Sequence, residues 1–265
     1  MLFRTTVTVP ALIVLATSCA LFALHSSDSS ADETSAAPPV ARDGAFAVVE
    51  LFTSEGCSSC PPADELLGEI ADDAQKRGVS IFPIAFHVDY WDGLGWKDRF
   101  SLAAATDRQQ RYAKTLGSEI YTPQMVVNGR TQFVGSDRDA YLRAVGAALA
   151  TPSAVQLHLE CKLKTAGDLS IGFTASNPPA GSVLNLVVVQ RSATTKVPRG
   201  ENSGRTLHHV NIARSIKTIP LDAASGEASL KLPGDLDVKD AMVVGFAQNA
   251  DSMQIVAAGR VDAAH

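Results

Sequence analysis

The chain has 265 residues, of which 46% are hydrophobic. This is enough for two domains with buried cores, and it excludes a disordered or fibrous protein. The formal net charge of -5 offers no basic surface to phosphate backbones, so nucleic acid is excluded as an expected partner, while proteins and small molecules remain.

The N-terminal segment has the order of a secretory signal. Arg4 precedes an apolar run over residues 7–24, after which the chain turns polar and small. The run is also about as long as the ~18–20 residues that span a bilayer, so an uncleaved anchor is the alternative. We predict a signal peptide or N-terminal anchor over residues 1–24. The expected location is periplasmic or secreted, with membrane contact only through that anchor.

The next stretch changes from a linker to an alternation of strands and helices. Residues 25–44 are mostly Ser, Asp, Ala and Pro, which predicts a disordered linker. Residues 45–150 show short apolar runs between helical patterns, which predicts an α/β domain. Its predicted elements are a strand from Ala45, a helix from Pro61 to Gly78, a strand over 79–89, a helix over 98–116, a hairpin over 125–134 turning at Asn128-Gly129, and a helix over 137–150.

Beyond Pro152 the hydrophobic period becomes two. Val155, Leu157 and Leu159 alternate with polar residues, and about seven such strands follow with turn residues between them. We predict an all-β, sandwich-like domain over residues 151–265.

Cys57 and Cys60 form a CxxC motif between a predicted strand and a predicted helix. A sulfur at a helix N-terminus faces unpaired N–H groups, which stabilise a thiolate, and such cysteines have pKa values lowered to about 3.5–7.5. The motif therefore favours a redox-active dithiol. A static structural disulfide and a metal site remain open, including one copper ion held by the two thiolates and His87.

Two polar residues near the motif have two interpretations each. Glu50 interrupts an apolar strand and could relay protons to Cys60, or it could be ion-paired and inert. His87 lies on the second predicted strand, where it could be part of the site or lie on a solvated edge. Cys161 is expected to be a lone, buried and inert thiol.

Two further segments are candidate walls of a substrate site. Thr122-Pro123 precedes a predicted strand, where a cis peptide would present the backbone of Thr122 to an extended substrate, and an ordinary trans proline is the alternative. Trp91 and Trp96 lie in a glycine-rich loop that could contact substrate or could cover the second domain. The charged segment 199–205 is expected to be a hairpin loop, with an interdomain contact as a further option.

Several of these segments together resemble the bacterial family called domain of unknown function 1223. They are Val49 to Asp64, His87 to Asp92, Tyr121 to Met125 and Arg199 to Asn202. The resemblance spans both predicted domains and implies an exported protein with a thioredoxin-like first domain. By the thioredoxin pattern it implies Cys57 as nucleophile, Cys60 as resolving thiol and Pro123 as a cis-proline. Two departures from thioredoxin leave the redox potential open: no tryptophan precedes Cys57, and Ser58-Ser59 stands between the cysteines.

The sequence thus predicts a thiol–disulfide oxidoreductase of the cell envelope that acts without a cofactor on protein thiols and disulfides or with a redox partner. Its expected catalytic residues are Cys57, Cys60, Pro123 and Glu50, and its expected substrate-binding residues are Thr122, Trp91 and Trp96. The alternative is a non-catalytic envelope binding protein with a structural or copper-carrying dithiol.

Overall fold

A computed structural model describes residues 43–164 and 167–264. All of them lie in one compact unit. The predicted signal or anchor over residues 1–24 and nearly all of the predicted linker over 25–44 lie outside the described residues. Within the described part, no helix is long and apolar enough to cross a membrane.

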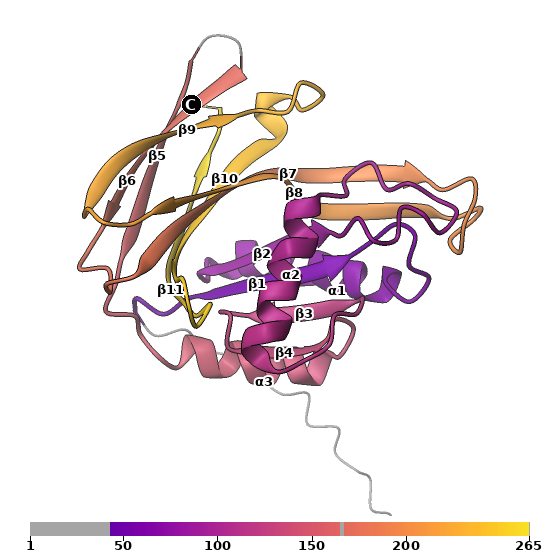
Figure 1. Cartoon of the computed structure of the whole chain (residues 1–265), viewed down its shortest axis with the longest axis horizontal. Coiled ribbons are helices and arrows are strands. Elements are labelled where there is room, and N and C mark those ends of the chain that lie inside the picture. The colour runs from indigo at the N-terminus through magenta and orange to yellow at the C-terminus, as the bar shows by residue number, and fades with distance from the viewer. Residues whose placement is uncertain (1–42, 165–166, 265) are drawn as a thin grey trace, which may run out of the picture. The chain divides into compact units, whose positions relative to one another are not determined.

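The described residues form a mixed α/β fold with a large sheet and few helices (Figure 1). Over the described ranges, eight strands form the large sheet in the order β11-β10-β7-β8-β2-β1-β3-β4, and three strands form a second sheet in the order β5-β6-β9. The strands are β1 (Ala47–Thr53), β2 (Ile81–His87), β3 (Gln124–Val127), β4 (Thr131–Val134), β5 (Leu157–Leu163), β6 (Asp168–Ala175), β7 (Ser182–Lys196), β8 (Thr206–Pro220), β9 (Ser225–Lys231), β10 (Ala241–Asn249) and β11 (Ile255–Asp262). The helices are α1 (Pro61–Arg77), α2 (Ala103–Leu116), α3 (Arg138–Leu149) and the short 3-10 helix η2 (Val238–Asp240).

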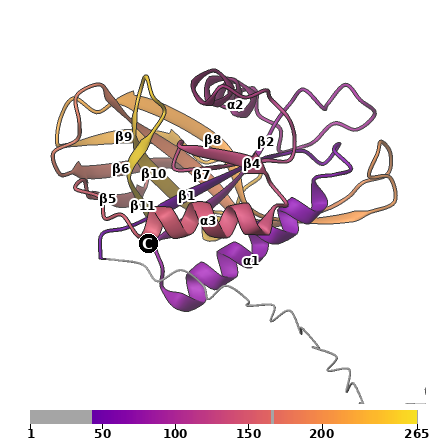
Figure 2. The ribbon, with the colours of Figure 1, turned by 90° about the horizontal axis from the view of Figure 1, so that it is seen from below.

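The two faces of the large sheet carry different helices. Figure 2 shows α1 and α3 on one face and α2 on the other. Because side chains alternate along a strand, β1 sends Val49 and Leu51 into the core beneath α1 and α3, and Val48 and Phe52 into the core beneath α2. Both faces of β1 are therefore buried, which explains its nearly continuous apolar sequence.

The predicted strands and helices are found, and one helix starts later than expected. The helix predicted over 98–116 begins at Ala103. Asp98 does not enter it because its carboxylate accepts hydrogen bonds from the backbone N–H groups of Glu55 and Phe100 and pairs with His87. Helix α1 begins with two prolines after Cys60 and ends at Gly78, whose φ of 63° is left-handed.

The predicted division into an α/β domain (45–150) and a β-sandwich domain (151–265) is not confirmed. The three-stranded sheet does pack on β7, β10 and β11 through a shared apolar core. However, β2 pairs in parallel with β8, at Ala85 and Ile212, and thereby joins the strands of both segments into one sheet. The core beneath α2 also takes residues from both segments, including Phe52 and Phe246. Each segment alone would leave an unpaired strand edge and an apolar face exposed.

Candidate functional site

The CxxC motif lies at the junction of β1 and α1. Cys57 and Cys60 form a disulfide with their Cα atoms 5.4 Å apart. Cys60 is the residue that caps α1, and its carbonyl accepts hydrogen bonds from the N–H groups of Ala63 and Asp64. Both cysteines are fully buried, whereas Ser58 and Ser59 between them are exposed. The disulfide thus lies at the N-terminus of α1 and is shielded from solvent.

The peptide bond between Thr122 and Pro123 is cis and lies beside the first turn of α1. Gly135 separates the two: a Cβ on Gly135 would lie 3.1 Å from the side chains of both Ala63 and Pro123. The Trp91 indole N–H donates to the Thr122 hydroxyl over 2.8 Å. The structure therefore brings together five of the predicted site residues: Cys57, Cys60, Trp91, Thr122 and Pro123.

Residues 197–205, which connect β7 to β8, form a capping loop over the motif. The side-chain amide of Asn202 donates to the carbonyls of Glu55 and Cys57, both at 2.9 Å. The Glu201 carboxylate accepts hydrogen bonds from the hydroxyl (2.7 Å) and the N–H (3.1 Å) of Ser58. These two hydrogen bonds lower the pKa of Glu201. The charged segment expected to be a hairpin loop is thus a hairpin loop that contacts the dithiol.

Trp96 lies between the capping loop and the chain before the cysteines. A Cβ on Gly200 would lie 3.0 Å from the Cβ of Trp96, so the close approach of the capping loop to Trp96 requires glycine at position 200. The Trp96 indole N–H donates to Glu55 over 2.8 Å. Trp96 therefore holds the carboxylate of Glu55 in place rather than lying free on the surface.

Glu50 lies on the face of β1 that is covered by α2, opposite to α1. Its two carboxylate oxygens accept from Nε (2.5 Å) and Nη2 (3.1 Å) of Arg108, and the Tyr112 hydroxyl also donates to it. Gln248 accepts from Arg108 and donates to the Tyr112 hydroxyl, each over 3.0 Å. We call these four residues the Glu50–Arg108 network. Glu50 is fully paired there, and its role in proton transfer stays an untested prediction.

A second buried polar group lies on the α1 side, at the ends of β1 and β2. We call it the histidine–carboxylate cluster; its members are Glu55, Asp64, His87, Asp98 and His209. Nδ1 of His87 lies 2.6 Å from the Asp98 carboxylate, and Nε2 of His209 lies 3.3 Å from Glu55. The two imidazole rings stand edge to face with centroids 4.9 Å apart. The cluster therefore gathers side chains from β2, β8, α1 and two loops beside the CxxC motif.

Burial and neighbouring charges shift the ionisation of this cluster. Burial raises the pKa of Asp64, although His209 and His87 partly oppose the shift. Burial alone would lower the pKa of His87, but the charge and hydrogen bond of Asp98 outweigh it and raise that pKa. Burial would likewise raise the pKa of Asp98, and the attraction of His87 lowers it instead. His87 and Asp98 thus form a charged pair next to a carboxyl group that resists ionisation.

The sequence analysis missed most of this cluster. Asp64 could have been found, because it is a carboxylate beside Ala63 and Leu67 on the apolar stripe of α1. His209 could not, because His208 precedes it and neighbouring strand residues face opposite sides, so only the register shows which histidine is buried. His208 is exposed and contacts Thr194.

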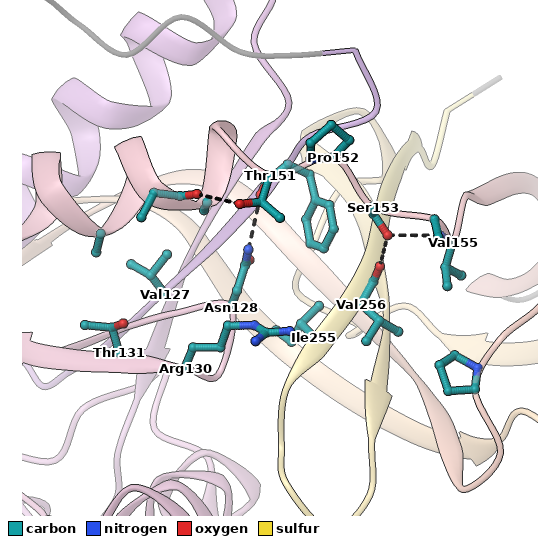
Figure 3. A pocket seen from close by; sticks show the side chains of 16 residues that line it. Val127, Asn128, Arg130, Thr131, Thr151, Pro152, Ser153, Val155, Ile255 and Val256 are labelled. Atoms are coloured by element: carbon teal, nitrogen blue, oxygen red, sulfur yellow. Dashed lines mark hydrogen bonds between the residues drawn. The ribbon is translucent and has the colours of Figure 1, made fainter.

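A cavity of about 500 Å³ lies near the start of β1 (Figure 3). The disulfide, by contrast, follows the end of β1. Apolar and small residues of α3 and β11 form much of its lining, including Ala144, Ala148 and Val256. Figure 3 shows that the Ser153 hydroxyl is bonded to Val256 and Val155. The side chains of Asn128, Thr151 and Ser153 thus form hydrogen bonds within the protein, and none of the lining residues belongs to the dithiol region.

Cys161 is a partly buried free thiol on β5, and burial raises its pKa. In the ranges that the structure describes, no group of three or more His, Cys, Asp or Glu side chains is arranged to hold a metal ion.

A family model described as "Protein of unknown function (DUF1223)" matches residues 48–248. The chain belongs to this family. Among solved structures, a protein of Agrobacterium tumefaciens from a structural genomics consortium is similar, with 27% identity and a TM-score of 0.62 over 84% of this chain and 96% of that one. HBP35 of Porphyromonas gingivalis is 19% identical with a TM-score of 0.60 over 83% of this chain and 75% of that one, which indicates a shared fold alone. A search of proteins with curated descriptions gave no match.

Proposed function

We propose that this member of the DUF1223 family is a thiol–disulfide oxidoreductase of the cell envelope that acts on protein substrates through Cys57 and Cys60. The observation that carries the proposal is the disulfide at the N-terminus of α1, beside the cis Thr122–Pro123 bond. A strand, a CxxC motif, a helix and a cis-proline strand are the parts of a thioredoxin-like site, and we propose that residues 45–150 correspond to one.

In this proposal the two cysteines have different roles. The substrate sulfur forms a mixed disulfide with Cys57, whose thiolate the N-terminus of α1 stabilises. Cys60 resolves that mixed disulfide by attacking Cys57 when the enzyme leaves its substrate. The backbone of Thr122 pairs with an extended substrate segment, and Trp91 and Trp96 form the opposite wall.

Exposed apolar side chains around the motif support a protein substrate. In the described part of the chain, the large hydrophobic residues that are exposed are Leu94, Ile120, Val134 and Leu163. Leu94 lies in the Trp91–Trp96 loop, Ile120 precedes Thr122 by two residues, and Val134 pairs with Gln124 next to Pro123. Three of these four apolar residues therefore border the segments that we assign to substrate binding.

The burial of both cysteines requires that the cover opens during exchange. The hydrogen bonds of Glu201 and Asn202 hold the capping loop on Ser58 and Cys57. Glu201 is exposed and its bonds exchange readily with water, so we propose that the capping loop is the part that moves.

The same burial favours a second candidate, a non-catalytic envelope binding protein whose dithiol is structural. A copper-carrying dithiol belongs to this candidate as well. A disulfide that is fully enclosed and held by Asn202 is protected from attack, as structural disulfides are. The two candidates differ in whether the pair opens in a glutathione buffer.

The deciding experiment is the equilibrium of the pair against glutathione redox buffers, read by thiol alkylation and mass spectrometry on the whole protein. A variant with both Cys19→Ser and Cys161→Ser serves as the background, so that only Cys57 and Cys60 report. A potential near about -120 to -180 mV indicates an oxidant or isomerase, and one near about -270 mV indicates a reductase. A pair that stays closed at all ratios, or a Cys57→Ser variant that exchanges disulfides as fast as wild type, contradicts the proposal. Copper bound by the reduced protein and lost in either cysteine variant supports the second candidate.

A further inference from the structure

The histidine–carboxylate cluster has polar atoms without partners in a place where water does not reach. Glu55, His87 and His209 are each at most 2% exposed. Nε2 of His87, Nδ1 of His209 and, beside the cluster, Oδ1 of Asn202 are buried and form no hydrogen bond, while Nε2 of His209 and Oε1 of Glu55 face only each other, as an ion pair at 3.3 Å. Each unpaired group costs about 1–3 kcal/mol. A purely structural cluster would be expected to satisfy them.

The cluster is connected to the disulfide through the backbone on both sides. Asp64 follows Cys60 by one helical turn, and its N–H bonds to the Cys60 carbonyl over 3.1 Å. Glu55 precedes Cys57 by two residues, and the Asn202 amide spans the carbonyls of both. Movement of either cysteine when the disulfide opens therefore reaches the cluster directly.

Opening a buried disulfide creates a charge that must be neutralised. When a substrate thiolate attacks Cys57, a bond forms between the two sulfurs and the Cys57–Cys60 bond breaks. The electron pair of that bond goes to Cys60, which becomes a thiolate. Because Cys60 is fully buried, bulk water does not solvate this thiolate, and its charge is costly unless a proton is supplied from within the protein.

We propose that the histidine–carboxylate cluster is the proton store of the Cys57–Cys60 pair, an inference that rests on the proposed function. An imidazolium of the cluster gives its proton to the Cys60 thiolate and becomes neutral. The second substrate thiolate then attacks the mixed disulfide and releases Cys57, so that the substrate is oxidised by two electrons and the enzyme pair is reduced. When a disulfide-bearing partner re-oxidises the pair, Cys60 returns its proton to the cluster.

The surroundings of His209 are suited to this role. Three carboxyl groups lie around His209: Glu55 from the loop after β1, Asp64 from α1 and Asp98 from the loop before α2. The His87 ring faces His209 from β2. The Phe100 ring packs against His209 at 5.8 Å between centroids. The guanidinium groups of Arg99 and Arg214 lie over the same Phe100 ring, 4.4 and 5.3 Å from its centroid. The carboxylates of Asp98 and Glu55 thus lie within 3.3 Å of ring nitrogens of His87 and His209, and the Asp98 carboxylate favours the charged form of His87.

The test compares two neighbouring histidines. We expect His209→Gln to slow opening of the disulfide by dithiothreitol by about 10²-fold near pH 7, the lower end of general acid–base effects. Corrected for the thiolate fraction of dithiothreitol, the wild-type rate should show an inflection between pH 5 and 9, and we expect His209→Gln to lose it. His208→Gln, on the exposed side of the same strand, should match wild type within about twofold. Asp64→Asn keeps the size of the side chain and should shift the inflection rather than abolish it.

A second measurement needs no variant. Imidazole resonances of the wild-type protein, titrated by NMR in the oxidised and reduced states, should show a different titration midpoint for a buried histidine in the two states. Identical midpoints, or a His209→Gln rate and pH profile equal to wild type, overturn the proton store. So does a stoichiometric metal in the purified protein that is lost in His209→Gln. These failures differ from failure of the proposed function. That function fails if the wild-type disulfide never opens or if Cys57→Ser exchanges disulfides as fast as wild type.

Discussion

The two sides of β1 carry two buried polar groups that differ in how well they are paired. On the α2 side, the Glu50–Arg108 network satisfies both oxygens of Glu50 and all three nitrogens of Arg108. On the α1 side, the histidine–carboxylate cluster leaves Nδ1 of His209 and Nε2 of His87 without a hydrogen bond. Both groups are buried to a similar degree, so burial does not explain the difference.

The difference separates a structural role from a functional one. The Glu50–Arg108 network joins β1, α2 and β10, and a fully satisfied network of this kind fixes how elements pack. The histidine–carboxylate cluster is left short of partners beside a disulfide, and departures from complete pairing are expected at functional sites. Changes in the first group should therefore alter stability at every pH, and changes in the second should alter reactivity and make both reactivity and stability depend differently on pH.

The largest effect is expected from Arg108→Met. The variant leaves the Glu50 carboxylate buried without its cation, which should cost about 3–5 kcal/mol in the free energy of unfolding. Denaturant unfolding measures this loss. Adding Glu50→Gln to Arg108→Met should restore part of the stability, because the uncompensated charge is removed.

The matched control is Arg111→Met, three residues further along α2. The Arg111 guanidinium is exposed and donates to the Ala250 carbonyl. It should change the unfolding free energy by less than about 1 kcal/mol. Equal losses in the two arginine variants would show that the Glu50–Arg108 network has no special structural role.

Gly129→Ala should disturb the same network from another direction. A Cβ at Gly129 would lie 1.9 Å from the Met253 carbonyl oxygen, which accepts a hydrogen bond from Gln248 over 2.5 Å. Gly117 has a similar φ (65° against 63°), and a Cβ there would meet nothing within 4 Å. Gly117→Ala should thus lower the free energy of unfolding by about 1–2 kcal/mol, the cost of a left-handed backbone conformation for alanine.

Since both alanines carry that backbone cost, the difference between them isolates the clash. We expect Gly129→Ala to be less stable than Gly117→Ala by about 1–3 kcal/mol, the range of overpacking, in urea unfolding. A difference near zero would mean that the turn moves away from Met253 without disturbing Gln248.

The local parts of this fold could be predicted from the sequence. The Asn128-Gly129 turn is found as a hairpin turn, with positive φ at both residues (50° and 63°). The two prolines after Cys60 place the CxxC motif at the start of α1 as expected. In each case the signal lies within a few residues, because turn and cap geometry depends on the local backbone.

The long-range parts could not be predicted in the same way. The pairing of β2 with β8 joins Ala85 to Ile212, and nothing in either strand's pattern identifies the other as its partner. For the same reason the sequence did not show that Asn202 reaches Cys57, or that His209 meets His87. The cysteines of the site were therefore predictable, and its buried acid–base groups mostly were not.

A smaller effect, with a defined pH dependence, is expected from His87→Gln. The pKa of His87 is raised above 6.5 in the folded protein, so its charged pair with Asp98 stabilises the fold fully below that pH. The contribution is lost as the pH rises through the folded pKa. The wild-type advantage over His87→Gln should be about 1.5–3 kcal/mol at pH 6, as for hydrogen bonds to charged groups, and should shrink towards pH 9.

Unfolding curves at pH 6, 7, 8 and 9 measure that trend. Asp98→Asn is the companion variant. The pKa of Asp98 is lowered in the folded protein, so the Asp98 carboxylate contributes to stability fully above pH 3.8, and this contribution is lost as the pH falls through the folded pKa. A wild-type advantage that is constant from pH 6 to 9 would contradict the charged His87–Asp98 pair.

The smallest effect is expected from Glu201→Gln in the capping loop, on the reactivity side of the comparison. The Glu201 carboxylate bonds to the N–H and hydroxyl of Ser58, next to Cys57, and there opposes a thiolate at the start of α1. Removing its charge should speed alkylation of Cys57 by iodoacetamide in the reduced protein by about two- to threefold, a size suited to an exposed charge. If the effect is electrostatic, it should fade in 1 M salt, where the Debye length is about 3 Å. An acceleration that persists in salt would instead show that Glu201 acts as a latch, and that the capping loop limits access to Cys57.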